Sequence, residues 1–146
     1  MAVSSKEMKY KKEIVGIELE TKNQCVGTLY EEEDRQAYRW TFKDIEHPNN
    51  FLPMAILLSS KYGKDCGGWA LSFFTTEELA TKRLENICSN KRHLHKKLGT
   101  HIAEGKIEKS DGLNGGYHPT NGHFSHYEYK ETDFSKKFVV KTLVDK

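Results

Sequence analysis

The chain has 146 residues, of which 36% are hydrophobic and 30% are charged. That length fits one domain that can bury a core without metal or disulfide support. Its 23 Lys and Arg against 21 Asp and Glu leave a formal charge of +2, which lacks the basic excess of proteins that bind duplex nucleic acid. Seven Phe, seven Tyr and two Trp exclude a disordered chain, because disordered chains are poor in aromatic residues.

The three cysteines, Cys25, Cys66 and Cys88, lie far apart in the sequence. Their odd number and wide spacing match neither a secreted disulfide framework nor the CxxC pairs of a zinc site. We therefore expect free thiols in a reducing compartment. The N-terminal stretch lacks the apolar segment of a secretory signal, and the longest apolar run, Met54–Leu58, is far shorter than the ~20 residues that span a bilayer. The sequence thus predicts a soluble, cytoplasmic protein.

The N-terminal part is predicted to be disordered at first and then to form strands. Residues 1–9 are polar and show no periodic pattern, so we expect disorder there and a single domain over residues 10–146. Mostly β-branched apolar residues predict a strand over Glu13–Glu20, and a second strand, Cys25–Tyr30, is expected to pair with it. The acidic run Glu31–Asp34 predicts a turn or the start of a short helix.

A strand, a turn and a short helix are expected next. Aromatic and polar residues alternate over Ala37–Phe42, which is typical of a half-buried strand. The segment His47–Asn50 (HPNN) predicts a turn, because Pro fixes φ and Asn tolerates turn geometry. The apolar segment that follows predicts a short buried helix with Pro53 in its first turn, and Ser59–Gly68 predicts a loop.

The middle of the chain carries the clearest helix pattern. The aromatic and apolar segment Trp69–Phe74 predicts a central strand, and Thr75 or Thr76 is expected to cap the helix after it. Thr75 followed by Glu78 has the spacing of a capping box. The helix is predicted over Thr76–Ile87, with Ala80, Leu84 and Ile87 buried against the strand.

The C-terminal part is predicted to be mainly strand. The three strands expected here are Thr100–Ile107, Gly122–Lys130 and Lys137–Val144. Between the first two, the Gly-rich segment Ser110–Asn121 predicts a long mobile loop. The fold class predicted is α+β, with a mixed or mainly antiparallel sheet of about six strands and one principal amphipathic helix, Thr76–Ile87, packed on a face.

A binding surface is predicted where this loop meets the next strand. His123 and Tyr127 are expected on one strand face, beside Tyr117 and His118 of the loop. An imidazole and a phenol there can clamp a polar ligand or exchange protons, although a Tyr-rich face packed under the helix explains the same pattern. Our first prediction is a non-enzymatic binding or accessory domain that recognises a protein or a small polar ligand.

Metal binding is not expected, despite seven histidines. His123 and His126 are three positions apart on a predicted strand, so their side chains should point to opposite faces. His93 and His95, two positions apart on a helix, should also diverge. The sequence therefore predicts neither a metal site nor a cofactor for the binding domain.

The alternative prediction is an enzyme that uses NAD. Arg39 lies on an aromatic strand, Ser72 on the Trp69–Phe74 strand, and Glu128 on a later strand. This order resembles the Arg–Ser–Glu arrangement of ADP-ribosyltransferases, although their Ser-Thr-Ser triplet and Gln/Glu-x-Glu motif are absent. The resemblance implies that Arg39 contacts an NAD phosphate, Ser72 shapes the nicotinamide pocket, and Glu128 stabilises an oxocarbenium-like transition state.

A third prediction is nucleic-acid binding through the basic segment Lys91–Lys97 (KRHLHKK). Clustered basic side chains can contact phosphates. No aromatic residue is interleaved with them, however, so the stacking pattern of single-strand binders is missing. A solvated helix end explains the same residues, and nucleic acid ranks below a protein or small-molecule partner.

Overall fold

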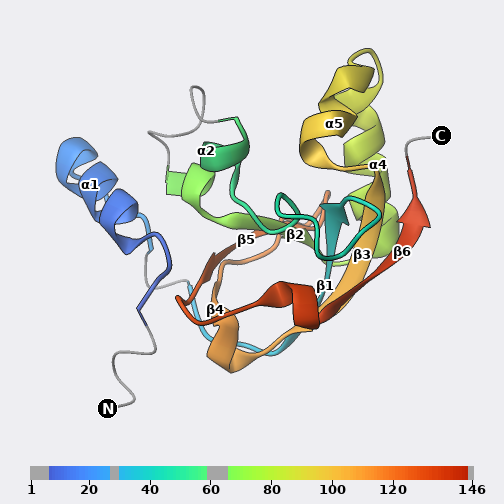
Figure 1. Ribbon diagram of the computed structural model, residues 1–146. Coiled ribbons are helices and arrows are strands. Elements are labelled where there is room, and N and C mark those ends of the chain that lie inside the picture. The colour runs from blue at the N-terminus through green and yellow to red at the C-terminus, as the bar shows by residue number, and fades with distance from the viewer. Residues whose placement is uncertain (1–6, 27–29, 59–65, 145–146) are drawn as a thin grey trace.

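A six-stranded sheet forms the centre of the computed structural model (Figure 1), which describes residues 7–26, 30–58 and 66–144. The strands are β1 (Arg35–Thr41), β2 (Leu71–Phe74), β3 (His101–Ile107), β4 (Gly112–Asn114), β5 (His123–Glu128) and β6 (Phe138–Leu143). Their order is β4-β5-β2-β1-β3-β6, and all neighbouring pairs are antiparallel. The predicted α+β fold class is confirmed, as is the central position of β2.

The described residues also form four α-helices around the sheet. They are α1 (Lys11–Thr21), α2 (Met54–Leu57), α4 (Glu77–Cys88) and α5 (His95–Leu98). Figure 1 shows α1 at one end of the molecule and α4 with α5 at the other. Short 3₁₀ helices occupy Cys66–Trp69, Arg92–Leu94, Lys109–Asp111 and Phe134–Lys136. Within the described residues, every helix is too short or too polar to cross a membrane.

The principal helix, α4, is confirmed. It begins after Thr76, whose hydroxyl accepts a hydrogen bond from the Leu79 N–H at 3.1 Å. Thr76 is therefore the capping residue, and Thr75, which has the capping-box spacing to Glu78, lies one residue before it. Ala80, Leu84 and Cys88 are buried, with a spacing of four residues that keeps them on one side of the helix. The predicted burial is right for Ala80 and Leu84, whereas Ile87 is partly buried at the edge of the same cluster.

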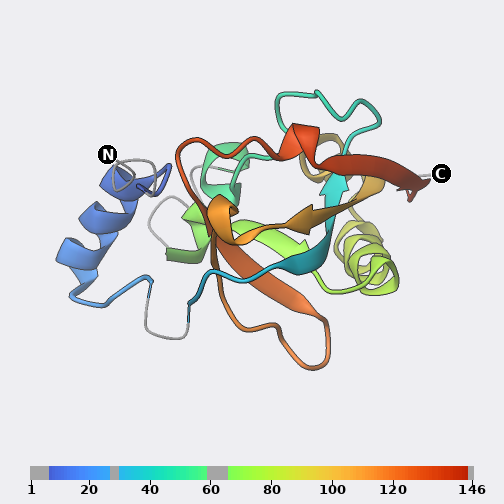
Figure 2. The ribbon, with the colours of Figure 1, turned by 90° about the horizontal axis from the view of Figure 1, so that it is seen from below.

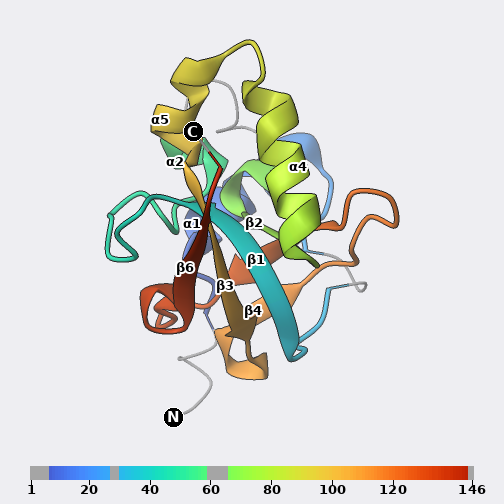
Figure 3. The ribbon, with the colours of Figure 1, turned by 90° about the vertical axis from the view of Figure 1, so that its right-hand side faces the viewer.

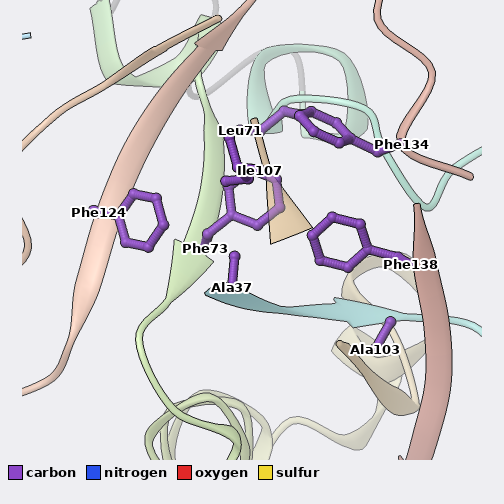
Figure 4. Close-up of a cluster of buried hydrophobic side chains, with 8 residues drawn as sticks. All are labelled: Ala37, Leu71, Phe73, Ala103, Ile107, Phe124, Phe134 and Phe138. Carbon is purple, nitrogen blue, oxygen red and sulfur yellow. The ribbon is translucent and has the colours of Figure 1, made fainter. Parts of the chain in front are cut away.

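The sheet buries apolar side chains on both faces. On one face Phe73 packs against Phe124, Phe134 and Phe138, with ring centroids 5.5–5.8 Å apart, as Figure 4 shows. On the other face Trp40 and Phe74 lie under α4. The indole N–H of Trp40 donates to the Ala80 carbonyl at 2.9 Å, which fixes α4 to β1.

The N-terminal strand prediction is wrong, because Glu13–Glu20 lies within helix α1. Ile14 and Ile17 are buried, and their spacing of three residues places them on one helical face, whereas Leu19 is 76% exposed. The β-branched composition suggested a strand, but helical periodicity decides which side chains are buried. Of the predicted strand Cys25–Tyr30, the described residues Cys25 and Val26 form a bend, and residues 27–29 lie outside the described residues.

Segments on either side of α1 pair with the sheet. Glu31 exchanges backbone hydrogen bonds of 3.0 and 2.8 Å with Asn114, so it is extended and the predicted turn or helix is wrong there. Residues 1–6 of the predicted disordered segment lie outside the described residues. Lys9 donates its N–H to the Glu128 carbonyl at 3.0 Å, and Glu7 accepts from Lys130 at 2.8 Å, so residues 7–9 continue β5's pairing.

Cys25 and Cys66 form a disulfide across 41 positions of sequence. The expectation of free thiols is therefore wrong for these two residues. The sequence spacing gave no sign of this bond, because the fold alone brings the segment after α1 to the 3₁₀ helix that precedes β2. Cys88, the last residue of α4, is buried.

The predicted loop Ser110–Asn121 is shorter than expected. Its first part forms a 3₁₀ turn and strand β4, which pairs with β5, and the remaining loop projects from the sheet (Figure 2). A Cβ atom at Gly112 would collide with the Tyr127 carbonyl, so glycine permits this close approach. From the sequence, this glycine was expected to lie in the mobile loop Ser110–Asn121.

The other predicted elements are confirmed within a few residues. They are the strands β1, β3, β5 and β6, the turn at His47–Asn50, and the short helix α2 after Pro53. Of the predicted loop Ser59–Gly68, residues 59–65 lie outside the described residues, and Cys66 begins a 3₁₀ helix.

A candidate ligand pocket beside helix α4

Strands β2 and β5 bring Ser72 and His123 together on the sheet face that α4 covers. Ser72 lies opposite Ser125, and Phe74 lies opposite His123, so Ser72 and His123 are diagonal neighbours on one face. The Ser72 Oγ and His123 Nε2 atoms are 3.0 Å apart, at hydrogen-bond distance. Both side chains are half-buried, which leaves part of each accessible.

This pair lies in a pocket of about 240 Å³ between the sheet and α4. We call it the α4 pocket; its lining residues are Trp40, Met54, Ser72, Phe74, Arg83, Ile87, Asn121 and His123. Half of these side chains are apolar, and the other half carry hydrogen-bonding groups. Figure 3 shows α4 beside the sheet, with the β4–β5 loop reaching toward it.

The end of that loop holds His123 in place. The Asn121 Oδ1 atom accepts a hydrogen bond from the His123 backbone N–H at 2.9 Å. Gly122, with φ of 70°, donates to the His118 carbonyl at 2.9 Å, and its own carbonyl accepts from Thr75 at 3.1 Å. The left-handed conformation suits glycine, and these bonds attach the loop to the start of α4.

The electrostatic surroundings keep His123 neutral. Burial lowers the pKa of its imidazole below the ordinary value of 6.5, and electrostatic interactions with Arg83 and His118 lower it further. A neutral imidazole has one donor and one acceptor nitrogen. Arg83, which is exposed, then supplies the permanent positive charge at the pocket.

A second hollow of about 200 Å³ adjoins the α4 pocket and shares Arg83 and Asn121 with it. It is also lined by Leu79, Lys82, Asn86 and Thr120. Lys82 adds another positive charge beside Arg83. The side of α4 that faces the β4–β5 loop therefore favours anionic groups.

The predicted ligand residues do not form one site. Tyr127 shares a strand face with His123, but it is only 2% exposed, and its hydroxyl donates to the Cys66 carbonyl at 3.1 Å. It packs with Ile14 and Ile17 of α1. Tyr117 is exposed on the loop, and His118 uses its Nδ1 atom to accept the Thr120 N–H at 3.1 Å. Of the four residues, His123 alone lines the α4 pocket.

The three residues of the ADP-ribosyltransferase resemblance, which we call the transferase constellation, are divided between the two faces of the sheet. Strand alternation places Arg39 and Glu128 on the face opposite the Ser72 side chain. Arg39 is buried and donates to the backbone carbonyls of Asn50, Ser72 and Leu52 at 2.7–3.0 Å. Desolvation lowers its pKa to about 10.

Glu128, the third residue of that constellation, is buried in the same interior. One of its oxygens lies 3.1 Å from the Lys9 ammonium group, and burial raises the pKa of the carboxyl group. Arg39 and Glu128 thus belong to the packed interior, and neither lines the α4 pocket.

The remaining histidines and basic residues are divided among other roles. His126 faces away from His123, and its Nδ1 atom lies 2.7 Å from Asn114 Oδ1 in the interior. In the part of the chain that the structure describes, no group of three or more His, Cys, Asp or Glu side chains is arranged to hold a metal. The segment Lys91–Lys97 contains a 3₁₀ helix and the start of α5, where His95 is buried and its Nδ1 atom lies 2.9 Å from the Gly99 carbonyl oxygen.

Comparison with known proteins gives no assignment. A scan against protein-family models found no match, and neither did searches of curated proteins and of solved structures.

Proposed function

We propose that this chain is a binding domain for a small organic anion and that the α4 pocket is its binding site. The observation that carries the proposal is the Ser72–His123 pair within a pocket that combines apolar walls with the Arg83 guanidinium group. Pockets of this composition favour ligands that have both an apolar body and a polar head. The sequence predicted either a protein or a small polar ligand as the binding partner, and the proposal chooses the small ligand.

The size of the pocket limits the ligand. Sites for drug-sized molecules measure roughly 300–1,000 Å³, whereas the α4 pocket measures about 240 Å³. This favours a small molecule and weighs against NAD, which is larger than a typical drug. Arg39 and Glu128 lie on the sheet face opposite the Ser72 side chain, and this separation also weighs against the transferase alternative.

The chemistry of the walls suggests a monocarboxylate. Trp40 and Ile87 offer apolar surface to an aromatic or branched aliphatic body, and Arg83 offers charge-assisted hydrogen bonds to a carboxylate. Asn121 and the neutral His123 can supply further hydrogen bonds without a net charge. We therefore take benzoate and isovalerate as the first probes.

Titration of the isotope-labelled chain with benzoate, followed by NMR, tests the proposal. We expect amide shifts at Ser72, Arg83 and His123, and we expect Arg83→Gln to weaken binding by about 10-fold or more, since a hydrogen bond to a charged group is worth ~1.5–3 kcal/mol. Lys91→Gln is the matched control, because it removes one exposed positive charge away from the pocket. Equal affinities of the two variants for both probes would overturn the proposal.

Cellular location is a separate proposal. The sequence predicts a cytoplasmic protein, but the Cys25–Cys66 disulfide favours an oxidising compartment, because cytoplasmic thiols are kept reduced. We propose that the folded chain works where this bond can form. Alkylation and mass measurement of the protein taken directly from its cells would show whether the two thiols are oxidised there.

A further inference from the structure

We propose that the Ser72–His123 pair also catalyses acyl transfer, with Ser72 as the nucleophile toward small carboxylic esters and His123 as the general base. The inference rests on the proposed function, because the acyl group of the ester must occupy the same α4 pocket as the carboxylate. The inference goes beyond binding, because hydrolysis of the ester releases the same kind of carboxylic acid that the pocket is proposed to bind.

The geometry of the pair fits this chemistry. The Ser72 Oγ to His123 Nε2 distance of 3.0 Å lies within the ~2.6–3.2 Å at which a base can accept the proton of a nucleophile. Both residues lie on hydrogen-bonded strands near the middle of the sheet, and rigid elements hold reacting groups more accurately than loops do. Both are half-buried and line the pocket.

His123 is in the charge state that a general base needs. Burial and the nearby Arg83 hold the pKa of its ring below 6.5, so the ring is unprotonated at neutral pH. With its proton on Nδ1, the Nε2 atom accepts the Ser72 hydroxyl proton. The bond from its backbone N–H to Asn121 fixes the position of the residue at the start of β5.

Donors for the developing oxyanion are present in the same pocket. The oxygen of the Asn121 side chain accepts the His123 N–H, so the amide NH₂ group is the end with hydrogens to donate elsewhere. The Arg83 guanidinium group lines the pocket too. Such donors stabilise the negative oxygen of a tetrahedral intermediate more than they stabilise the starting ester.

The reaction has two balanced halves. Ser72 Oγ forms a bond to the ester carbonyl carbon while its proton passes to His123 Nε2. The bond from that carbon to the alcohol oxygen then breaks, and His123 returns the proton to the departing alcohol. In the second half, water attacks the acyl-serine with His123 as base, which releases the carboxylic acid and restores the Ser72 hydroxyl.

We expect this reaction to be slow. Among the residues that the structure describes, no carboxylate hydrogen-bonds the His123 ring. In serine hydrolases, replacement of the carboxylate that orients the histidine lowers kcat by about 10⁴-fold. The covalent acyl-serine is accordingly a better readout than turnover.

The experiment is incubation of the chain with p-nitrophenyl acetate, followed by mass measurement and peptide mapping. We expect one acetyl group per chain on Ser72, formed with a burst of nitrophenolate, and a rate that falls on acidification as His123 becomes protonated. His123→Gln should lower the rate of Ser72 acylation by about 10²-fold or more. Ser72→Ala should abolish the burst, and Ser72→Cys should keep an adduct at that position.

Ser125→Ala is the matched control, because Ser125 lies opposite Ser72 on β5 and is also half-buried. It should be acylated at Ser72 like the original chain. Acetylation confined to lysines, or an equal burst from folded Ser72→Ala, would overturn the proposal. Benzoate binding in the pocket without acylation would leave the binding function intact and reject only the catalytic step, whereas absence of both would reject the two together.

Discussion

Arg39 illustrates how a charged side chain serves packing in this protein. Its guanidinium group is buried between Phe51 and Phe73, with its central carbon 5.9 and 5.6 Å from the ring centroids. Its three hydrogen bonds to carbonyl groups join β1 to β2 and to the segment before α2. The resemblance to ADP-ribosyltransferases implied that Arg39 contacts an NAD phosphate, but its hydrogen bonds go to carbonyl groups of the chain itself.

Arg39→Ala should therefore act on stability. The change removes the donor of one buried and two partly buried carbonyl groups and opens a cavity, so we expect the free energy of unfolding to fall by about 3–5 kcal/mol. Urea denaturation measures this directly. Lys106→Ala on β3, where the side chain is 61% exposed, serves as the control and should change stability by less than ~1 kcal/mol. A well-folded, equally stable Arg39→Ala protein would contradict the packing role.

Residue patterns in the sequence found part of the pocket. Ser72 and His123 were both singled out, but for different sites, because sequence alone does not give the register that makes them diagonal neighbours. Trp40 and Arg83 were missed as pocket residues. Their proximity depends on how α4 packs across the sheet, and the indole bond to Ala80 that fixes this packing has no local sequence signal.

At the scale of elements, prediction succeeded where periodicity and composition agreed. Helix α4 has a polar face, a cap and a buried stripe that all indicate the same structure. Helix α1 combines β-branched residues, which favour a strand, with helical spacing of its buried residues. The segment is helical because this spacing lets Ile14 and Ile17 both reach the interior. Strand β4 is only three residues long and depends on the close approach at Gly112, so its short sequence carries little information of its own.

Truncation of buried and exposed leucines tests the placement of two helices. Leu84 on α4 is fully buried, so Leu84→Ala should lower the free energy of unfolding by about 2–5 kcal/mol. The same truncation at Leu19 on α1, which is 76% exposed, should change it by ~0.5 kcal/mol or less. Thermal or urea unfolding of both variants provides the comparison. A large loss of stability in the Leu19 variant would contradict the exposed position of this side chain on α1.

The disulfide acts at the scale of the whole molecule. Cys25 and Cys66 enclose β1 and α2 within one covalent loop. In the chain-entropy description, a cross-link over 41 positions stabilises the fold by about 4 kcal/mol, because it removes conformations from the unfolded chain. The bond also joins the segment after α1 to the 3₁₀ helix that leads into β2.

Removal of the bond should lower stability without changing the sheet. We expect Cys25→Ser with Cys66→Ser to lose about 4 kcal/mol of unfolding free energy, and a reducing agent should give the original chain a similar loss. Cys88→Ser is unsuitable as a control because Cys88 is a buried residue at the end of α4, so the oxidised original chain is the reference. Identical urea midpoints with and without reductant would show that the thiols are not bonded in solution.

The strand order has a consequence for the time course of folding. Strand β2 pairs with β5, and the hydrogen-bonded Ser72 and His123 are separated by 51 positions of sequence. Contacts between such distant segments form slowly, since the chain must close a long loop before it gains any pairing energy. On the ribosome, β5 and the Asn121 turn emerge long after β1, β2 and α4. A growing chain that ends before Asn121 therefore lacks Asn121 and His123, two of the eight residues that line the α4 pocket, so the pocket is complete only after the start of β5 has been synthesised.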